Sequence, residues 1–576
     1  TLEEAGLADK NNNYIVALSW QKNIWGLAVA DLTTGEFKVL ETSDEDLLRN
    51  ELFRLAPAET IANSNLIEDV KQRKIFQNLK NVNAFSLSAF DTPYNLLTEH
   101  FKQKNLLSFG IENFKVGINA AGLLLGYLNE TQKTKLEHIS KITHYATQMY
   151  MTLDEATIRN LELFATSNNE YQGSLLSVLD KTLTNMGGRM LRRWLLTPLI
   201  QKEEIVERQD TVKEFLNQPN LASDLRDQIK DIADLERLIG RIGCNKAFPR
   251  DLCGLKLSLN KIPYIKEFLA GTPVKKLTML ATALGDHREL VEYLDKAIMD
   301  EPAALLSDGG YIKDGYNEQL DELRQISRGG KEWLLAYQTK EIERTKIHTL
   351  KVRFNKVFGY YIEVTNPNLN QVPEDYTRKQ TLVNGERFTT PELKEYEEKI
   401  LGAEEKIIKL EQQIFIEALE TVTRHFAEIQ KAAEALAELD VLLCYAQIAA
   451  EYSYICPAIN EDGRIEIKNG RHPVIERFIS MPYVPNDLEM NHEKNEFILL
   501  TGPNMSGKSS FLRQSALISL MMQMGSFVPA DGANLCIVDR IFTRVGASDN
   551  LTQGVSTFMA EMQEAANILN NATSES

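Results

Sequence analysis

The sequence predicts a multidomain protein that combines α-helical and α/β parts. Its 576 residues exceed the length that one hydrophobic core usually serves, so we expect three to five domains of roughly 150 residues each. A run rich in Trp, Ile, Val and Phe at residues 13–40 indicates strands, and a proline-free stretch at residues 392–451 indicates long helices. A glycine-rich turn at residues 502–509, followed by a helical run, indicates a phosphate-binding domain.

The N-terminal part is predicted to be a small α/β domain over residues 1–110, because helical spacing in "DEDLLRNELFRL" follows the strand-rich run. Beyond it, apolar residues recur at i, i+3, i+4 and i+7, and proline and glycine fall mainly between these runs. We therefore expect residues 117–310 to be almost entirely helical, with long lever helices further along the chain.

The lever prediction depends on the stretch 392–451. An apolar residue returns at every seventh position, as in a coiled-coil seam, at Leu393, Ile400, Ile407 and Ile414. One continuous helix of this length would reach roughly 90 Å at 1.5 Å per residue. Residues 316–350 are the predicted antiparallel partner.

Residues 351–391, at the far end of the two helical runs, are predicted to form a β-rich tip with an Asn384-Gly385 turn. The whole chain has a net charge of −17, which disfavours nucleic acid, but the wider stretch 331–391 holds ten Lys/Arg against seven Asp/Glu. From the residues alone, a clamp on a phosphate backbone and a solvated charged hairpin remain equally open. The candidate DNA contacts are Arg344, Lys346, Lys351, Arg353, Lys356, Arg378, Lys379, Asn384 and Arg387.

The phosphate-binding motif is Gly502-x-x-x-x-Gly507-Lys508-Ser509, which has the Walker A form. The glycines let successive backbone N–H groups point at a phosphate, Lys508 neutralises its oxygens, and the Ser509 hydroxyl is suited to ligate Mg²⁺. We expect ATP and Mg²⁺ as cofactors, with Lys508 and Ser509 as the catalytic pair. The expected loop contacts are Gly502, Pro503, Asn504, Met505, Ser506, Gly507, Lys508, Ser509 and Ser510.

Other features of this region are less decisive. Phe497–Leu500 has the composition of a buried strand leading into the loop. Tyr483 is either an adenine-stacking ring or a core aromatic, and its proline neighbours favour the core aromatic. A helix is predicted to begin at Ser556 or Thr557, either as an ordinary capped helix or to offer Ser556 to a second nucleotide. Asp539 comes nearest to the strand-borne acid that hydrolysis requires, but no second acid follows it. Hydrolysis is therefore expected to be weak or absent.

The compartment is predicted to be the cytoplasm. Five cysteines without a C-x-x-C spacing indicate reduced thiols, the apolar runs are too short to cross a bilayer, and the first residues lack the features of a secretory signal. The sequence does not begin with Met, which suggests a processed or excised start.

These residues together resemble the bacterial MutS family of DNA mismatch repair ATPases. The resemblance covers nearly the whole chain in family order, through "MGGRMLRRWLLTPL" (186–199), "DLERL" (234–238), "NKVFGYYIEV" (355–364), "PELKEYEEKIL" (391–401), "AELDVL" (437–442), "GRHPVIE" (470–476), "TGPNMSGKSSFLRQ" (501–514), "DRIFTRVGASD" (539–549) and "STFMAEM" (556–562).

The resemblance implies an RNase H-like connector domain at residues 1–110, a helical core with levers at 117–330 and 392–455, a DNA clamp at 331–391 and an ABC-type ATPase domain at 456–576. It also implies that Tyr483 stacks on adenine and that Ser556 reaches the nucleotide of a second subunit. Mismatched double-stranded DNA, a second copy of the chain and a MutL-type repair factor are the implied partners, in a nucleoid-associated protein without a membrane segment.

The chain departs from the family pattern at both ends. A Phe-x-Glu mismatch-binding domain, the Walker B strand, the histidine loop and the helix-turn-helix region are missing, so the resemblance implies a truncated form. Ser506 and Ser510 stand where many bacterial members have Gly and Thr. Two alternatives remain: a relative that binds branched recombination DNA, and a non-catalytic module for DNA clamping or protein interaction.

Overall fold

The computed structural model contains two compact units, and each is described by itself. The first comprises Thr1–Lys246, Leu257–His287 and Thr423–Ser576, and the second comprises Ala247–Lys256 and Arg288–Val422. The residues described are 10–72, 79–88, 91–134, 136–145, 149–355, 359–503, 506–544 and 557–576.

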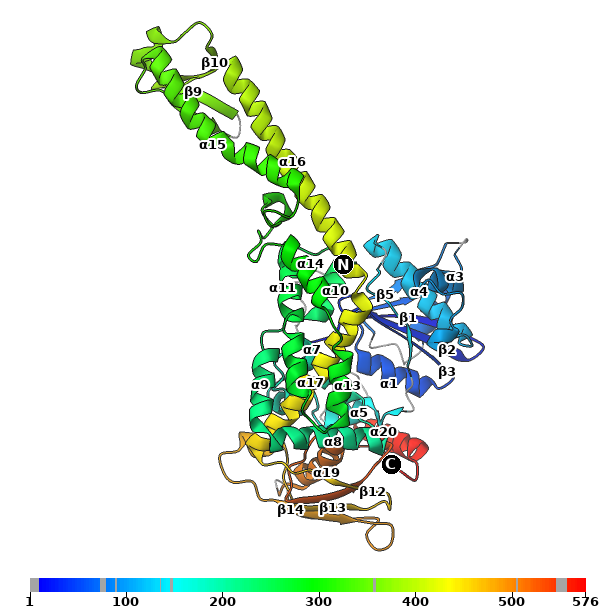
Figure 1. Cartoon of the computed structure of the whole chain (residues 1–576). Coiled ribbons are helices and arrows are strands. Elements are labelled where there is room, and N and C mark those ends of the chain that lie inside the picture. The colour runs from blue at the N-terminus through cyan, green and yellow to red at the C-terminus, as the bar shows by residue number, and fades with distance from the viewer. Residues whose placement is uncertain are drawn as a thin grey trace. The chain divides into compact units, whose positions relative to one another are not determined.

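The first unit begins with a mixed sheet of strand order β5-β4-β1-β2-β3-β6 (Figure 1). Its members are β1 (Tyr14–Gln21), β2 (Ile24–Asp31), β3 (Glu36–Thr42), β4 (Glu59–Ala62), β5 (Val82–Ala84) and β6 (Thr143–His144). The β1-β2-β3 meander is antiparallel, whereas the pairs β1–β4, β4–β5 and β3–β6 are parallel. The predicted strands at residues 13–40 are confirmed.

Alternation along the strands gives this sheet two apolar faces. The face that carries Ile15 and Ala17 packs on α3 (Pro93–His100) and α4 (Lys115–Gln132). The opposite face carries Val16 and Leu18, and its core includes side chains from α1 (Glu45–Leu55) and α2 (Ser64–Gln72). Because α4 covers the sheet, the α/β part extends to His144, beyond the boundary near residue 110 expected from the sequence.

The helical core of the first unit is built around α17 (Phe426–Tyr452), which is buried on all sides for most of its length. Its neighbours include α7, α8, α9, α10 and α13. The helices of this part are α5 (Glu155–Asn160), α6 (Leu175–Leu179), α7 (Asn185–Leu196), α8 (Lys202–Asn217), α9 (Pro219–Ile229), α10 (Leu235–Gly243), α12 (Ile262–Leu269) and α13 (Lys275–Ala283). The carboxylate of Asp440 on α17 accepts the N–H groups of Leu183 and Thr184, which anchors the start of α7.

The second unit contains the lever helices α15 (Glu318–Thr345) and α16 (Pro391–Thr423), together with α14 (Arg288–Ala297). Helix α11 (Pro249–Leu259) begins in this unit. Lys340 pairs with Glu392, and Arg324 pairs with Glu411, so α15 and α16 run antiparallel as predicted. The single long helix expected over 392–451 is wrong, because the helix ends at Thr423 and α17 starts at Phe426. Helix α16 buries one apolar stripe, whereas α17 is buried on nearly all sides. The two helices therefore pack in different hydrophobic cores.

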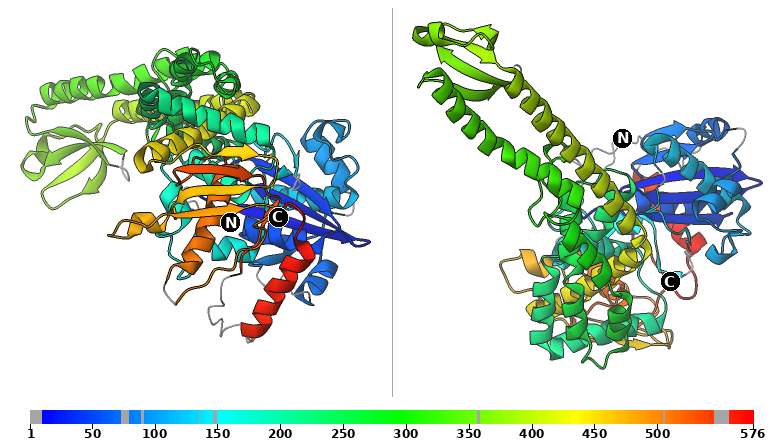
Figure 2. Two further views of the ribbon diagram at one scale, coloured as in Figure 1. Left: turned by 90° about the horizontal axis from the view of Figure 1, so that it is seen from below. Right: turned by 45° about the horizontal axis from the view of Figure 1, so that its top comes forward.

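A four-stranded antiparallel sheet of order β10-β11-β9-β8 lies at one end of the α15–α16 pair (Figures 1 and 2). Its strands are β8 (Lys351–Asn355), β9 (Gly359–Thr365), β10 (Thr377–Thr381) and β11 (Gly385–Thr389). The Leu382 N–H donates to the Gly385 carbonyl at 2.8 Å, so the chain turns at Val383 and Asn384, one residue before the predicted Asn384-Gly385 turn, and Gly385 already belongs to β11. Ile362, Val364 and Phe388 pack on Tyr337 and Leu393 of the two helices.

The C-terminal part of the first unit is a second sheet, of order β12-β15-β13-β14, with helix α19. Its elements are β12 (Ala458–Asn460), β13 (Ile465–Gly470), α18 (Ile475–Phe478), β14 (Asn486–Met490), α19 (Lys508–Gln523), β15 (Gly532–Cys536) and α20 (Thr557–Asn571). A short parallel pair joins β16 (Arg540–Ile541) to β7 (Thr152–Leu153) of the helical core.

The buried strand predicted at Phe497–Leu500 is wrong. These residues form no strand, and the exposed fractions of Phe497 and Leu499 are 83% and 77%. A strand needs a hydrogen-bonded neighbour, and none of the described strands pairs with this segment.

The five cysteines are free thiols, as predicted. Among the helices that the structure describes, none is long and apolar enough to span a bilayer.

Candidate nucleotide site and nucleic-acid interface

The turn before α19 depends on its two glycines. Gly507 caps the helix with φ of 87°, a left-handed conformation that other residues adopt only at a cost. A Cβ atom at Gly502 would lie 2.8 Å from Ser506 Oγ, so a side chain there would require the Ser506 hydroxyl to move. The chain therefore turns sharply into the helix as the motif predicts.

The start of α19 presents groups that bind anions. Gly507 supplies no side-chain cap, so the first N–H groups of the helix keep their capacity to donate to a ligand. The Lys508 ammonium donates to the carbonyls of Gly502 and Pro503 at 2.7 Å each, which holds it against the loop. Ser509 is exposed in the first turn, and Ser510 is half-buried. This arrangement suits a phosphate group, with the Ser509 hydroxyl available to a cation.

Tyr483 lies beside the same helix. Its hydroxyl donates to Oε1 of Gln514, a fully buried residue on α19, at 2.9 Å. Burial raises the pKa of Tyr483 above its ordinary value, so the hydroxyl remains a donor at neutral pH. The structure places this ring beside the middle of α19 and leaves it half-buried, which suits both interpretations of Tyr483.

Two residues that the sequence did not single out support this site. The buried His472 accepts the N–H groups of Val474 and Ile475 at Nδ1, and burial, followed by the charge of Arg513, lowers its pKa to about 4. Its only sequence signal was its place in "GRHPVIE".

Gln523 anchors the far end of α19. It is fully buried and donates to the carbonyls of Leu199 and Val538 at 2.8 and 2.9 Å. A glutamine within a helical run carries no distinguishing sequence pattern, so this anchor could only be found in the structure.

The acids that follow the loop are engaged elsewhere. Asp539 accepts from the hydroxyls of Thr573 and Ser576 at 2.9 Å each, and Asp531 accepts from Asn469 at 2.9 Å. In the part of the chain that the structure describes, no group of three or more His, Cys, Asp or Glu residues is placed to hold a metal ion. Asn504, Met505, Ser556 and Lys356 lie outside the described residues.

The tip carries three exposed cations, Lys346 at the C-terminal end of α15 and Lys351 and Arg353 on β8. Lys351 and Arg353 are two positions apart on β8, so both side chains point away from the same face of this strand. Within the described residues, no carboxylate lies within 4.0 Å of these three charges. They are therefore available to an external anion.

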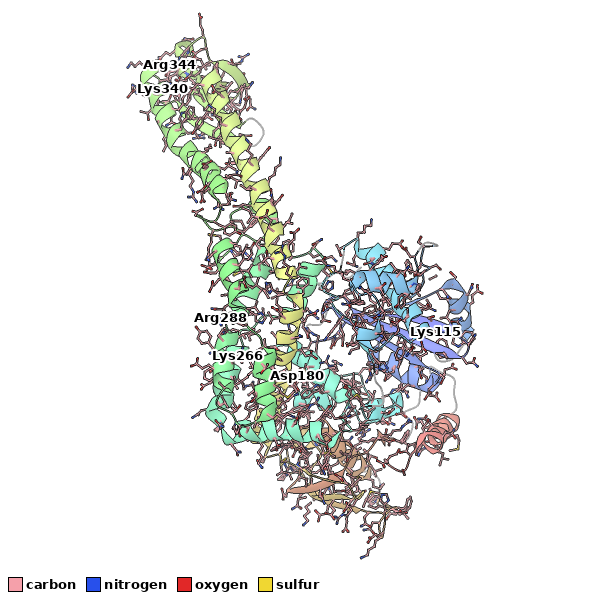
Figure 3. All side chains as sticks on the ribbon, turned by 45° about the vertical axis from the view of Figure 1, so that its right-hand side comes forward. Lys115, Asp180, Lys266, Arg288, Lys340 and Arg344 are labelled. Atoms are coloured by element: carbon pink, nitrogen blue, oxygen red, sulfur yellow. The ribbon has the colours of Figure 1, made fainter. Side chains whose placement is uncertain are left out.

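The other predicted DNA contacts are held by neighbours. Arg344, labelled with Lys340 near the end of α15 in Figure 3, pairs with Glu341 at 2.7 Å and with Asp375 at 3.1 Å. The remaining cations are bound in similar ways: Arg378 to Glu386 at 3.2 Å, Lys379 to Glu397 at 3.5 Å, and Arg387 to the ring of Tyr361 at 4.2 Å. The exposed Asn384 accepts the Asn366 N–H in the turn. The predicted contacts thus divide into free cations and cations that stabilise the tip.

Three segments of the chain match models of one known protein family. Family models match three segments: MutS domain II at residues 13–140, MutS domain III at 156–446 and MutS domain V at 498–576. The chain belongs to the MutS family. The domain II match ends near the last strand of the N-terminal sheet, and the domain V match includes the phosphate loop and α19.

Curated MutS proteins align along the whole chain. The DNA mismatch repair protein MutS of Halothermothrix orenii is 47% identical, over 100% of this chain and 65% of the relative. That of Acetivibrio thermocellus is 44% identical, over 100% of this chain and 67% of the relative. The chain thus spans about two thirds of the length of these MutS relatives.

Proposed function

We propose that this chain acts in DNA mismatch repair, binding ATP with Mg²⁺ at residues 502–510 and double-stranded DNA at the tip sheet. The observation that carries the proposal is the start of α19, where a glycine cap in the left-handed conformation leaves the helix N-terminus open and Lys508 lies against the loop. Backbone N–H groups, a helix dipole and an ammonium at one point are the usual means of holding a nucleotide phosphate.

Individual roles follow from these positions. The backbone of Gly502, Pro503, Asn504, Met505, Ser506 and Gly507 would surround the phosphates, with the hydroxyl of Ser510 beside them. Lys508 would exchange its carbonyl contacts for phosphate oxygens, Ser509 would ligate Mg²⁺, and Tyr483 would stack on adenine. The bound cation would neutralise phosphate charge. Ser556 would contact the nucleotide of a second copy of the chain.

The remaining assignments rest on family membership and on the tip. We infer an RNase H-like connector in the N-terminal sheet, levers in α15 and α16, and an ABC-type ATPase domain around α19. The free cations Lys346, Lys351 and Arg353 would grip the DNA backbone without reading sequence. A homodimer on mismatched DNA, recruiting a MutL-type factor in the cytoplasm beside the nucleoid, is the expected working form.

Calorimetric titration with ATP and Mg²⁺ tests the nucleotide site. The chain should bind nucleotide through the loop, and Lys508→Ala should weaken this binding by at least about tenfold, because it removes a charge-assisted contact. Lys494→Ala, which removes an exposed lysine upstream of the loop, is the matched control and should leave the affinity unchanged. Equal affinities of the wild type and Lys508→Ala would overturn the proposal.

A binding module without turnover is the second candidate function, and the positions of Asp531 and Asp539 favour it for this chain. Both carboxylates are engaged by hydrogen bonds remote in sequence from Ser509. Phosphate release by the purified chain separates the two candidates. Turnover that Lys508→Ala abolishes would exclude the non-catalytic module.

A further inference from the structure

A cavity of about 880 Å³ lies within the first unit, apart from the phosphate loop. Tyr14, Lys38 and Tyr145 line it from the N-terminal sheet, and Arg192 and Arg208 line it from α7 and α8 of the helical core. This volume is in the range of pockets that enclose a small organic ligand. No residue of the phosphate loop contributes to its wall.

The wall of this cavity is cationic. Lys38, Arg54, Arg159, Arg192, Arg193 and Arg208 line it, against the carboxylates of Glu204 and Glu434. Some of these charges are compensated: Arg54 pairs with Glu51 at 2.5 Å, and Glu36 lies 3.8 Å from Arg193 and also pairs with Lys38.

Arg192 and Arg208 are not compensated in this way. Their guanidinium groups have no carboxylate within 4.0 Å in the described part of the chain. Arg208 lies 3.3 Å from the ring centroid of Trp194 and donates to the Met524 carbonyl at 2.9 Å, while Arg192 lies 4.8 Å from the ring centroid of Phe164. Burial lowers the pKa of Arg192 and lowers that of Arg208 to about 10. Both charges would be stabilised by an anion, because desolvated charge without a counter-ion is unfavourable.

The rest of the wall is largely aromatic. Tyr14, Phe53, Tyr145, Tyr150, Phe164 and Trp194 line the same cavity. Flat rings beside guanidinium groups favour a ligand that joins a planar ring to an anionic group, since rings stack and the guanidinium fork matches phosphate oxygens. Inorganic phosphate alone would leave most of this wall without a partner.

We propose that this cavity is a second ligand site, distinct from the phosphate loop, which binds a nucleoside phosphate with its phosphate group on Arg192 and Arg208. Because cations already cover the rings of Tyr145, Phe164 and Trp194, the base packs on the other aromatic residues of the wall, Tyr14, Phe53 and Tyr150. The site is of mononucleotide size, so a longer nucleic-acid strand is not its ligand.

The test uses the Lys508→Ala chain, in which nucleotide binding at the phosphate loop is weakened, and titrates it with ADP and with pyrophosphate by calorimetry. ADP should still bind with one equivalent per chain, more tightly than pyrophosphate. Arg192→Gln and Arg208→Gln should each weaken ADP by about tenfold or more, the value of one charge-assisted contact. Lys202→Ala is the control: this cation lies on the same helix as Arg208, pairs with Glu461 and does not line the cavity, so the affinity should not change.

Absence of ADP binding by the Lys508→Ala chain at millimolar concentration would overturn the proposal, as would unchanged affinity in Arg192→Gln. Equal affinities for ADP and pyrophosphate would exclude a nucleoside ligand. Thermal unfolding establishes whether Arg208→Gln is folded. Photolabelling with an azido-ADP should modify peptides around Tyr145 or Trp194 in the Lys508→Ala chain, but not in the Lys508→Ala/Arg192→Gln double variant. The phosphate loop is assessed separately, by comparing the wild type with Lys508→Ala.

Discussion

Arg324 of α15 and Glu411 of α16 form an ion pair inside the lever, with Arg324 Nη2 2.5 Å from Glu411 Oε1. The Glu411 side chain is fully buried and accepts the Gly310 N–H at 2.7 Å through its second oxygen. Arg324 also pairs with Asp314 at 2.6 Å. The pair therefore fixes the two lever helices and the segment before α15 to one another.

Removing one partner of this pair should destabilise the lever strongly. Glu411→Ala leaves the Arg324 guanidinium buried with less compensation, and we expect a loss of about 3 kcal/mol in the free energy of unfolding. Urea unfolding, together with faster amide hydrogen exchange across α15, measures the effect. An Arg324→Met/Glu411→Leu double variant should recover most of the loss, because neither charge then remains; a double variant as unstable as the single one would contradict this reasoning.

Charge reversal on β8 should weaken binding to any DNA duplex. The exposed Lys351 and Arg353 are free to contact phosphates, so Lys351→Glu/Arg353→Glu should reduce the slope of log K against log salt by about one unit for each phosphate that is no longer neutralised. Fluorescence anisotropy over a salt series gives the slope. Lys399→Glu reverses one charge on the exposed surface of α16, outside the tip sheet, and should not alter the slope. A slope preserved in the double variant would identify the tip as a solvated hairpin.

The ring of Tyr483, more than its hydroxyl, should support nucleotide binding. Tyr483→Ala is expected to weaken ATP by about tenfold or more, the usual contribution of a base stacked on an aromatic ring. Tyr483→Phe keeps the ring and loses only the hydrogen bond to Gln514, so it should retain the affinity while stability falls by about 1 kcal/mol. Calorimetry and thermal unfolding separate the two effects. If both variants bind like the wild type, Tyr483 is only a core aromatic.

The stability of the protein should fall in mild acid because of His138. This residue is fully buried between the N-terminal sheet and the helical core, its Nε2 lies 3.0 Å from the Leu32 carbonyl, and burial lowers its pKa to about 4. The unfolded chain binds a proton near pH 6.5 and the folded chain does not, so stability is complete above that pH and decreases as pH falls toward 4.

The expected loss from His138 is about 2 kcal/mol between pH 7.5 and 5.0. His472, whose pKa is also lowered to about 4, should add a similar amount. Urea unfolding at several pH values measures the summed loss in the free energy of unfolding. His138→Gln, which can still donate to the Leu32 carbonyl, should abolish the part of this pH dependence that comes from His138. An identical pH dependence in His138→Gln would exclude this origin.

Much of the local structure could be predicted. The expected helix at 316–350 is observed as α15 at Glu318–Thr345, and the run after the loop is observed as α19. A turn between β10 and β11 is also observed, but it is centred on Val383 and Asn384, one residue before the predicted pair. These features depend on spacing and backbone preference within a few residues.

The errors concern partners that are distant in the chain. Phe497–Leu500 has the composition of a strand, but strands form only where a neighbouring strand pairs with them. Helix α4 reads as part of a helical core, and only the packing against β1 and β2 assigns it to the sheet. Arg344 remains a predicted DNA contact, and Glu341 and Asp375 pair with it in the folded tip.

The sequence by itself determined the phosphate loop, the lever helices and the basic tip, because glycine conformation, helical periodicity and local charge act over short separations. Tertiary structure alone decided which charges are free. Glu411 and Arg324 form their ion pair although they are 87 positions apart in the sequence. The cavity that contains Arg192 and Arg208 is lined by residues from Asn11 to Glu434. Such pairings depend on the complete packing of the chain, since each charge is stabilised or left uncompensated only by the neighbours that folding brings to it.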